Sequence, residues 1–151
     1  MKIAIGSDQW GFDFKKMIIE TFSKKGHEFV DAGAFSKDSV SYPVIANAVS
    51  TKVVNGECER GILICGTGIG MAIATNKVKG VYAAVCHDIY STERSILSNN
   101  SNIMCIGALV IGPKTAESLV DLWLQLRFDS SSASAQKVAQ IYQIENGTLG
   151  V

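Results

Sequence analysis

Residues 61–70 read Gly-Ile-Leu-Ile-Cys-Gly-Thr-Gly-Ile-Gly, an apolar run that ends in a glycine-rich turn. A short and nearly continuous apolar run is typical of a parallel strand that is covered on both faces. Glycines allow a tight turn after it, and a short helix is predicted from Thr67 or Gly68 to about Val78. The stretch therefore predicts a strand, a turn and a helix, which is the repeating unit of an α/β fold.

Runs of the same kind recur along the chain and alternate with segments of helical periodicity. We expect strands at residues 2–6, 27–31, 61–65, 81–85 and 102–106, and helices at 12–25, 43–54, 67–78, 88–98, 113–126 and 137–145. This alternation predicts an α/β fold with a doubly wound, five-stranded parallel sheet, helices on both faces and a C-terminal helix. The expected strand order is the flavodoxin-like 2-1-3-4-5.

The composition narrows the class of protein. With 151 residues the chain has the length of one domain, which we expect to span 1–151. Apolar residues make up 47% of it, but no run approaches the ~18 residues that a membrane-spanning helix needs. Met1 leads into the first strand with only Lys2 between and no leader segment. We therefore expect a cytoplasmic protein without a membrane partner.

Charge and cysteine content exclude further classes. Fourteen basic residues balance fourteen acidic residues, and no basic block is present, which argues against a nucleic-acid partner. The four cysteines show neither a C-x-x-C pair nor metal-ligand spacing, so we expect no metal site and no disulfide. Small-molecule chemistry is favoured by elimination.

The predicted topology places two reactive side chains at one crevice. In an open parallel sheet, ligands bind beyond the carboxyl ends of the strands, where the strand order reverses. The first strand ends at Asp8 and the third at Cys65, so these residues should face each other there. The glycine turn after Cys65 lets backbone N–H groups converge on one point and precedes a helix N-terminus, which favours an anion and can lower a thiol pKa. A thiolate and an oxyanion hole would coincide.

Each of these features also has a plainer interpretation. Glycine turns bind dinucleotides as well, but such a turn normally follows the first strand, whereas this one follows the third. Cys65 can be a small buried apolar residue, and Asp8 can cap the helix that follows it. Trp10 can line a pocket or a subunit interface, and His87 can lie at the pocket rim or in solvent. These alternatives stay open at the level of the sequence.

Several motifs point to one family when they are taken together. They are Ile-Gly-Ser-Asp at 5–8, Gly11-Phe12, Tyr42-Pro43, the stretch 61–70, Asn76-Lys77-Val78 and Cys-His-Asp-Ile-Tyr-Ser at 86–91. With them the sequence, from Met1 to about Lys137, resembles the sugar-phosphate isomerase family that contains ribose-5-phosphate isomerase B and the galactose-6-phosphate isomerase subunits. The resemblance implies interconversion of aldoses and ketoses through a cis-enediolate, without metal or cofactor, by a homodimer or homotetramer.

The resemblance also implies roles for particular residues. Cys65 is the base that moves a proton between C1 and C2, and Asp8 handles the protons of substrate hydroxyls. The developing enediolate oxygen requires fixed donors, which the Thr67 hydroxyl and the backbone amides of the turn would supply. The amide donors are those of Gly66, Thr67, Gly68, Ile69 and Gly70. Tyr42 would line the pocket, and Asn99 would contact a substrate oxygen.

The sequence departs from the family pattern where the family holds the phosphate and the sugar ring. Gln9-Trp10 replaces His-Ala, Ser98 replaces a histidine proposed to open the furanose ring, and Leu109 replaces an arginine. Gly-Gly-Arg-His is replaced by Ser-Ser-Ser-Ala at 130–133, which leaves Lys137 as the basic residue nearby. Gln9, Trp10, Ser98 and Lys137 are therefore expected to bind the substrate in ways that differ from the family.

Three explanations of these departures remain. The substrate can be a different sugar, short enough to have no ring to open, with Trp10 shrinking the pocket. A homologous partner subunit can supply the absent basic residues. Catalysis can be lost while ligand binding is kept. We predict an aldose–ketose isomerase that acts on a small sugar or sugar phosphate, with its specificity shifted away from ribose 5-phosphate. The alternative is a non-catalytic or partner-dependent sugar-binding subunit of a hetero-oligomeric isomerase.

Overall fold

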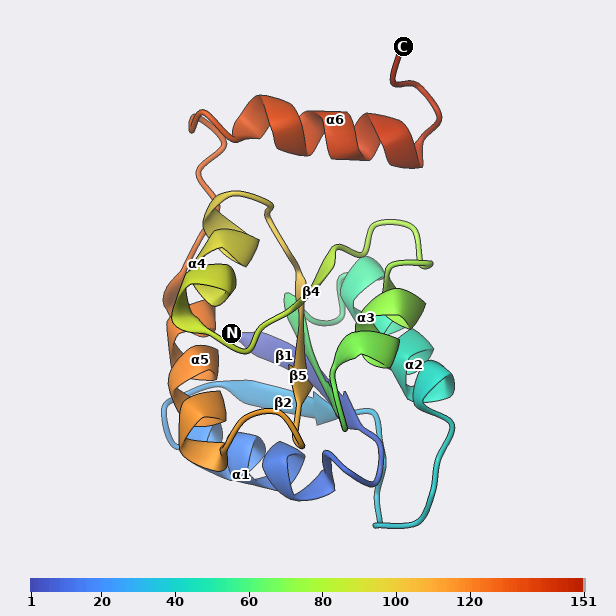
Figure 1. Ribbon diagram of the computed structural model, residues 1–151, viewed down its shortest axis with the longest axis vertical. Helices are drawn as coiled ribbons and strands as arrows, with labels where there is room; N and C mark the ends of the chain where they lie inside the picture. Colours follow the sequence, from blue (N-terminus) through green and yellow to red (C-terminus); the bar gives the residue numbers. More distant parts are fainter. Residues whose placement is uncertain (151) are drawn as a thin grey trace.

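One parallel sheet of five strands forms the centre of the computed structural model, which describes residues 1–150 (Figure 1). The strands are β1 (Lys2–Ser7), β2 (Glu28–Asp31), β3 (Arg60–Cys65), β4 (Ala83–Val85) and β5 (Ile103–Gly107). The helices are α1 (Phe12–Ser23), α2 (Tyr42–Val54), α3 (Ile69–Thr75), α4 (Ile89–Leu97), α5 (Pro113–Gln125) and α6 (Ala135–Glu145). The predicted fold class, a doubly wound α/β sheet, is confirmed.

The strand order is β2-β1-β3-β5-β4, so the last two strands are exchanged relative to the expected order. β5 pairs with β3 along its whole length, from Gly61 opposite Ile103 to Cys65 opposite Gly107. Burial explains the exchange: every residue of β5 is buried, whereas the three residues of β4 are only partly buried. The fully apolar strand takes the inner position, and the short one becomes the edge.

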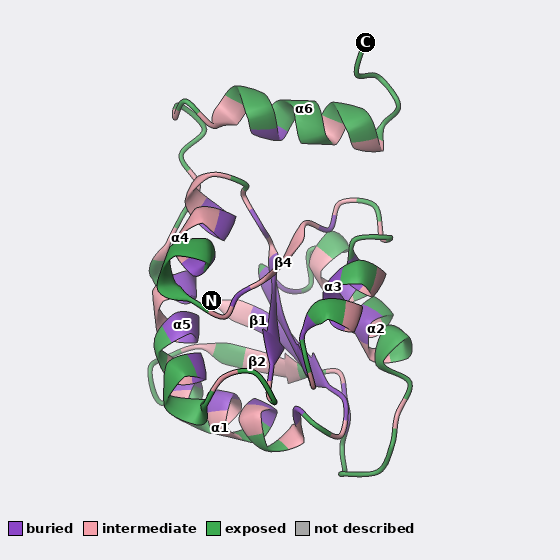
Figure 2. Ribbon diagram, viewed as in Figure 1, coloured by how far each residue is buried: buried purple, intermediate pink, exposed green. Residues whose placement is uncertain are grey.

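Helices cover both faces of the sheet, as Figures 1 and 2 show. On one side α1, α4 and α5 pack over a core that includes Ile18, Phe22 and the fully buried Trp123. On the other side α2 and α3 pack over a smaller core around Val49 and Met71. The buried strands between these layers leave only the two ends of the sheet open to carry polar chemistry.

The sixth helix lies outside the layers, across the end of the sheet at which the strands begin (Figure 1). Its Glu145 carboxylate accepts hydrogen bonds from the Tyr82 hydroxyl and the Gly80 amide, both at 2.8 Å. The Tyr142 hydroxyl accepts a hydrogen bond from the Asn100 side chain at 3.0 Å, and Val138 is buried. These contacts attach α6 to the loops that precede β4 and β5.

The described residues, 1–150, include neither a candidate membrane span nor a candidate metal-binding cluster. No helix there combines the length and apolar character needed to cross a membrane. No group of three or more His, Cys, Asp or Glu side chains there is arranged to hold a metal ion.

Candidate active site

The carboxyl edge of the sheet brings Asp8 and Cys65 together. In the register of β1 with β3, Ser7 lies opposite Ile64, and the Asp8 amide donates to the Ile64 carbonyl at 3.1 Å. Asp8 and Cys65 are therefore the next residues on two neighbouring strands, and both are buried. The juxtaposition expected from the topology is present.

The turn after β3 directs a backbone amide at the thiol. The Gly68 amide donates to Cys65 Sγ at 3.0 Å, and the Ile69 amide donates to Thr67 Oγ1 at 3.3 Å. Gly68 has a φ of 76°, and a Cβ atom there would lie 3.0 Å from the carbonyl carbon of Ile106. A residue with a side chain would strain this turn, so the glycine is what allows the amide to reach the sulfur.

The loop after β5 supports the same turn from behind. The amides of Ala108 and Leu109 donate to the carbonyls of Cys65 and Gly66 at 2.8 and 3.0 Å. A Cβ atom on Gly107 would lie 2.7 Å from the Thr67 carbonyl, so the two backbones are in close contact. The position of the turn therefore depends on β5, a contribution that was not predicted from the sequence.

Asp8 organises the start of α1 with one of its oxygens. Its Oδ1 accepts from the amides of Trp10 and Gly11 at 2.9 and 3.1 Å. The capping interpretation of Asp8 thus describes this oxygen. Burial raises the pKa of the Asp8 carboxyl, and the two backbone hydrogen bonds oppose that rise. A carboxyl with a raised pKa exchanges protons closer to neutral pH than an ordinary aspartate does.

Three large side chains form the walls around the turn, where glycines let them approach. A Cβ atom on Gly66 would lie 3.3 Å from Leu109 and 3.8 Å from Trp10, and one on Gly70 would lie 2.9 Å from the Tyr42 ring. Trp10 is 57% exposed and Leu109 is 67% exposed. The mouth of the site is therefore apolar where Trp10 and Leu109 lie.

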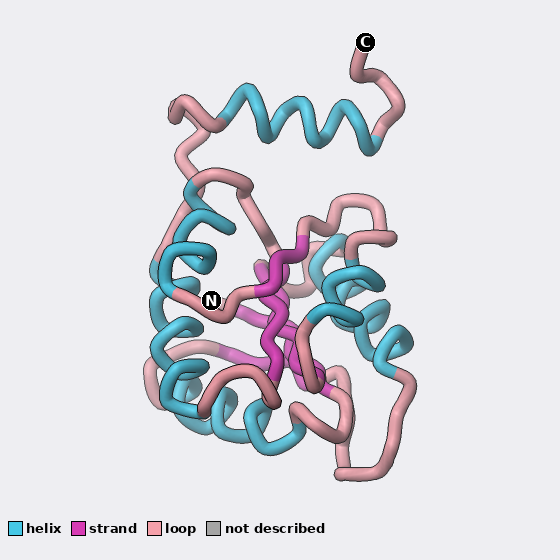
Figure 3. The backbone as a smooth tube through the Cα atoms, viewed as in Figure 1, coloured by secondary structure: helices cyan, strands magenta, loops and turns pink. Residues whose placement is uncertain are grey.

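Gln9, between Asp8 and Trp10, binds the loop that precedes α2. Its Oε1 accepts from the Val40 amide at 3.5 Å, and the segment from Val40 leads directly into Tyr42 at the start of α2. Figure 3 shows this long connection from β2 to α2 beside the carboxyl edge. Through this contact with Val40, Gln9 helps to position Tyr42.

Three predicted substrate-binding residues, Ser98, Asn99 and Lys137, lie elsewhere in the same chain. α4 begins at the carboxyl edge and runs back along the sheet, so Ser98 and Asn99 at its end lie at the opposite edge. Lys137 is an exposed residue of α6, which crosses that opposite edge. Within one chain these three residues therefore do not lie at the Cys65 site, and their role in substrate binding stays a prediction.

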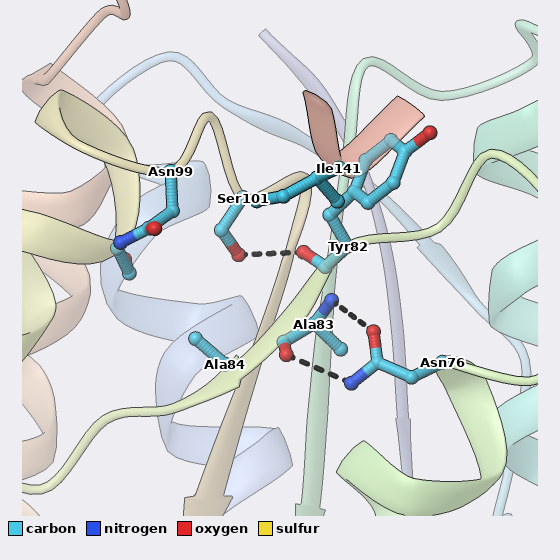
Figure 4. A pocket seen from close by; sticks show the side chains of 8 residues that line it. Asn76, Tyr82, Ala83, Ala84, Asn99, Ser101 and Ile141 are labelled. Atoms are coloured by element: carbon cyan, nitrogen blue, oxygen red, sulfur yellow. Dashed lines mark hydrogen bonds between the residues drawn. The ribbon is translucent and has the colours of Figure 1, made fainter. Parts of the chain in front are cut away.

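Asn99 instead lines a pocket of about 280 Å³ at the edge where the strands begin (Figure 4). Its side chain donates to the Arg94 carbonyl at 3.0 Å. Asn76 on the far side binds both the amide and the carbonyl of Ala83, at 2.8 and 3.0 Å. The pocket residues are Asn76, Tyr82, Ala83, Ala84, Ser95, Asn99, Ser101 and Ile141.

Comparison with known proteins agrees with this fold. The family model described as Ribose/Galactose Isomerase matches residues 3–141. Ribose-5-P isomerase B of Listeria innocua is 50% identical over 136 residues, which cover 90% of this chain and 92% of that protein. D-erythrulose-4-phosphate isomerase 2 of Mycolicibacterium smegmatis is 46% identical and covers 96% and 97%. The solved structure of Clostridium thermocellum ribose-5-phosphate isomerase B has a TM-score of 0.94, with 42% identity over 99% of this chain and 100% of that chain.

The fold is a parallel sheet with a buried thiol at the end of β3 and a buried carboxyl just after β1. The chain belongs to the Ribose/Galactose Isomerase family. The predicted enzyme class, an aldose–ketose isomerase similar to ribose-5-phosphate isomerase B, is confirmed by these relatives.

Proposed function

We propose that the protein interconverts a four-carbon aldose phosphate and its ketose phosphate through a cis-enediolate. The observation that carries this proposal is the apolar wall of Trp10 and Leu109 over Gly66, which narrows the site and offers no charged donor there. Relatives support the choice of length. Besides the Mycolicibacterium protein, the D-erythrulose-4-phosphate isomerase of Pectobacterium atrosepticum is 40% identical over 97% of this chain.

In the proposed reaction the Cys65 thiolate removes the proton from C2 of the aldose and returns it to C1 of the enediolate. The Gly68 amide, which donates to Sγ, stabilises the thiolate before reaction. The Thr67 hydroxyl and the remaining amides of the turn stabilise the enediolate oxygens. Asp8, whose pKa burial raises, moves the hydroxyl proton between O2 and O1.

A four-carbon substrate also accounts for the absence of a ring-opening residue. An aldose phosphate whose C4 oxygen carries the phosphate has no free hydroxyl there to close a five-membered ring on C1. Such a substrate is already open when it binds, so the replacement of a histidine by Ser98 costs nothing.

We further propose that the site is completed by self-association, as a dimer or tetramer. Large apolar side chains are exposed on both sides of the edge strand β4: Ile69 and Ile73 on α3, and Ile89 and Tyr90 on α4. An exposed strand edge flanked by apolar residues favours a protein contact. A second copy would bring Asn99 and Lys137 from its own opposite edge to the Cys65 site.

Hydrogen exchange tests the proposal. The purified protein is incubated in D2O with erythrose 4-phosphate, ribose 5-phosphate and galactose 6-phosphate, and deuterium uptake at C1 and C2 is followed by NMR. We expect the highest kcat/KM for the four-carbon substrate, and loss of exchange in Cys65→Ala. Cys58→Ala is the matched control, because Cys58 is equally buried but lies in the loop before β3, away from the site.

Two results would contradict the proposal. A higher kcat/KM for ribose 5-phosphate would replace the proposed substrate. Exchange that appears only after a homologous subunit is added would favour the partner-dependent alternative; one relative, at 31% identity, is the galactose-6-phosphate isomerase subunit LacB of Clostridium acetobutylicum.

A further inference from the structure

We propose that His87 is a positioning residue for the isomerisation. Its imidazole fixes Gly107 and, through Gly107, the turn of residues 66–70 that follows Cys65 and contains Thr67. The inference builds on the proposed function, in which that turn holds the base and the enediolate donors. His87 follows β4 and Cys86 in the chain and reaches across to the end of β5. It thereby links the edge strand to the centre of the candidate site.

The geometry of this link is direct. His87 Nε2 accepts a hydrogen bond from the Gly107 amide at 2.8 Å. Gly107 in turn touches the turn at two places, since its amide nitrogen and a Cβ atom added to Gly68 would be 3.2 Å apart, and its own added Cβ atom would be 2.7 Å from Thr67. The backbone of Gly107 is therefore close to those of Thr67 and Gly68, and a displacement of Gly107 toward the turn would press on them.

Among the described residues, 1–150, no other strand holds the Gly107 amide at this point. β4 pairs with β5 only from Ala83 to Val85, opposite Ile103 to Cys105. The Cys86 amide makes the last backbone bond, to the Cys105 carbonyl at 2.9 Å. Beyond it the imidazole takes the place of the next strand residue. Without this acceptor, the amide of a buried residue would lack its partner, which is costly.

The bond requires a neutral imidazole. Nε2 accepts only when its lone pair is free, so Nδ1 carries the proton in this tautomer. Burial lowers the pKa of His87, and the Asp88 carboxylate beside it opposes this effect. The other titratable side chains on the adjoining strands and loop are the thiols of Cys65, Cys86 and Cys105, and burial raises the pKa of the latter two.

Protonation of His87 at low pH destabilises the folded chain. Because the pKa of His87 is lower in the folded chain than in the unfolded chain, the unfolded chain binds more protons between the two values. The stabilising bond is complete above the ordinary value of 6.5 and is lost as the pH falls through the lowered one. A protonated ring would direct an N–H group at the Gly107 amide and release the turn.

Two substitutions separate positioning from packing. His87→Ala removes the acceptor, and we expect kcat to fall about fivefold with little change in KM, the size of one lost hydrogen bond. His87→Gln can present Oε1 near the place of Nε2 and does not titrate. We expect it to recover most of kcat and to keep the Gly107 amide NMR shift constant between pH 7 and 5. In the wild type that shift should follow the His87 titration.

Further variants sharpen the test. Asp88→Asn keeps the cap on α4 and removes the charge, so the His87 titration and the acid limb of kcat should move together to lower pH. His27→Ala, at the other histidine, is the matched control and should change neither quantity. An unchanged kcat in His87→Ala, or a Gly107 shift that ignores the His87 titration, would overturn the role of His87. Exchange that is still lost in Cys65→Ala would then leave the proposed function standing.

Discussion

The two ends of the same sheet use their polar groups in opposite ways. At the edge where the strands begin, side-chain amides and hydroxyls are used to close the backbone: Asn76 pairs with both backbone groups of Ala83, and Asn102 binds the Tyr82 amide and the Gly80 carbonyl. At the carboxyl edge, backbone amides instead bind side chains. The Gly68 amide donates to the Cys65 sulfur, and the Trp10 amide donates to an Asp8 oxygen.

The difference in hydrogen bonding between the two edges indicates where function can reside. Groups whose hydrogen bonds are saturated within the chain contribute stability, whereas groups left partly free can meet a substrate. We therefore expect substitutions at the carboxyl edge to change rate or specificity, and substitutions of the backbone-bound amides Asn76 and Asn102 at the opposite edge to change the free energy of unfolding.

The largest effect is expected at Cys65. Cys65→Ala removes the proposed base, and general-base catalysis is worth roughly 10²–10⁴-fold. We expect deuterium exchange into the sugar phosphate to fall about 1,000-fold, while circular dichroism stays unchanged. A variant with near-normal exchange would show that the thiol is only a packing residue.

Asp8→Asn should divide activity from stability. Asparagine keeps an acceptor for the Trp10 and Gly11 amides but cannot shuttle a proton, so we expect kcat to fall about a hundredfold. Because the folded pKa of Asp8 lies above its ordinary value of 3.8, wild-type stability should fall as the pH rises through that interval.

The asparagine variant should lose this pH dependence and be slightly more stable at neutral pH. Urea denaturation at several pH values measures it. Asp13→Asn, an exposed carboxylate paired with Lys37, is the control and should not gain stability. An equal loss of activity and stability in Asp8→Asn would favour a purely capping role.

A change of specificity is expected at the apolar wall. The double variant Trp10→Ala, Leu109→Arg widens the mouth and adds a charged donor, which should raise kcat/KM for ribose 5-phosphate relative to erythrose 4-phosphate about tenfold. Val110→Arg places the same charge one residue further on, and we expect no change of that ratio. An unaltered ratio in the double variant would separate the wall from substrate choice.

The smallest effect on rate is expected at the opposite edge. Asn76→Ala removes two hydrogen bonds to the edge strand and should lower the free energy of unfolding by about 1–2 kcal/mol. kcat per folded molecule should not change, and Asn47→Ala, on the exposed face of α2, should alter neither quantity. A large fall in kcat would show that the two edges are not independent in the assembled enzyme.

Much of the fold was predictable because alternation of apolar runs and helical periodicity is a local property. The exchange of β4 and β5 was not, since the choice between an inner and an edge position depends on which run is buried on both faces. The continuous run Ile103–Ile106, beside the two alanines of β4, was the available signal.

The site was predictable where it depends on the ends of neighbouring strands. Asp8 follows β1 and Cys65 ends β3, and topology alone places them together. Motifs do not tell at which edge of the sheet a residue lies, so the location of Asn99 at the edge opposite Cys65 was not predicted. The direction of α4 was the available signal, because a helix that starts at the carboxyl edge of the sheet ends at the opposite edge. The position of His87 on Gly107 needed the coordinates.

The bonds from Ala108 and Leu109 to the Cys65 turn have a consequence during synthesis. Their donors lie more than forty positions downstream of the thiol, at 108 and 109 against 65. A ribosome makes the chain from its amino terminus, so the sulfur and its glycine loop emerge long before their support exists. A nascent protein halted before residue 107 has the Cys65 turn without the donors that fix it, so the turn takes its final position late in translation.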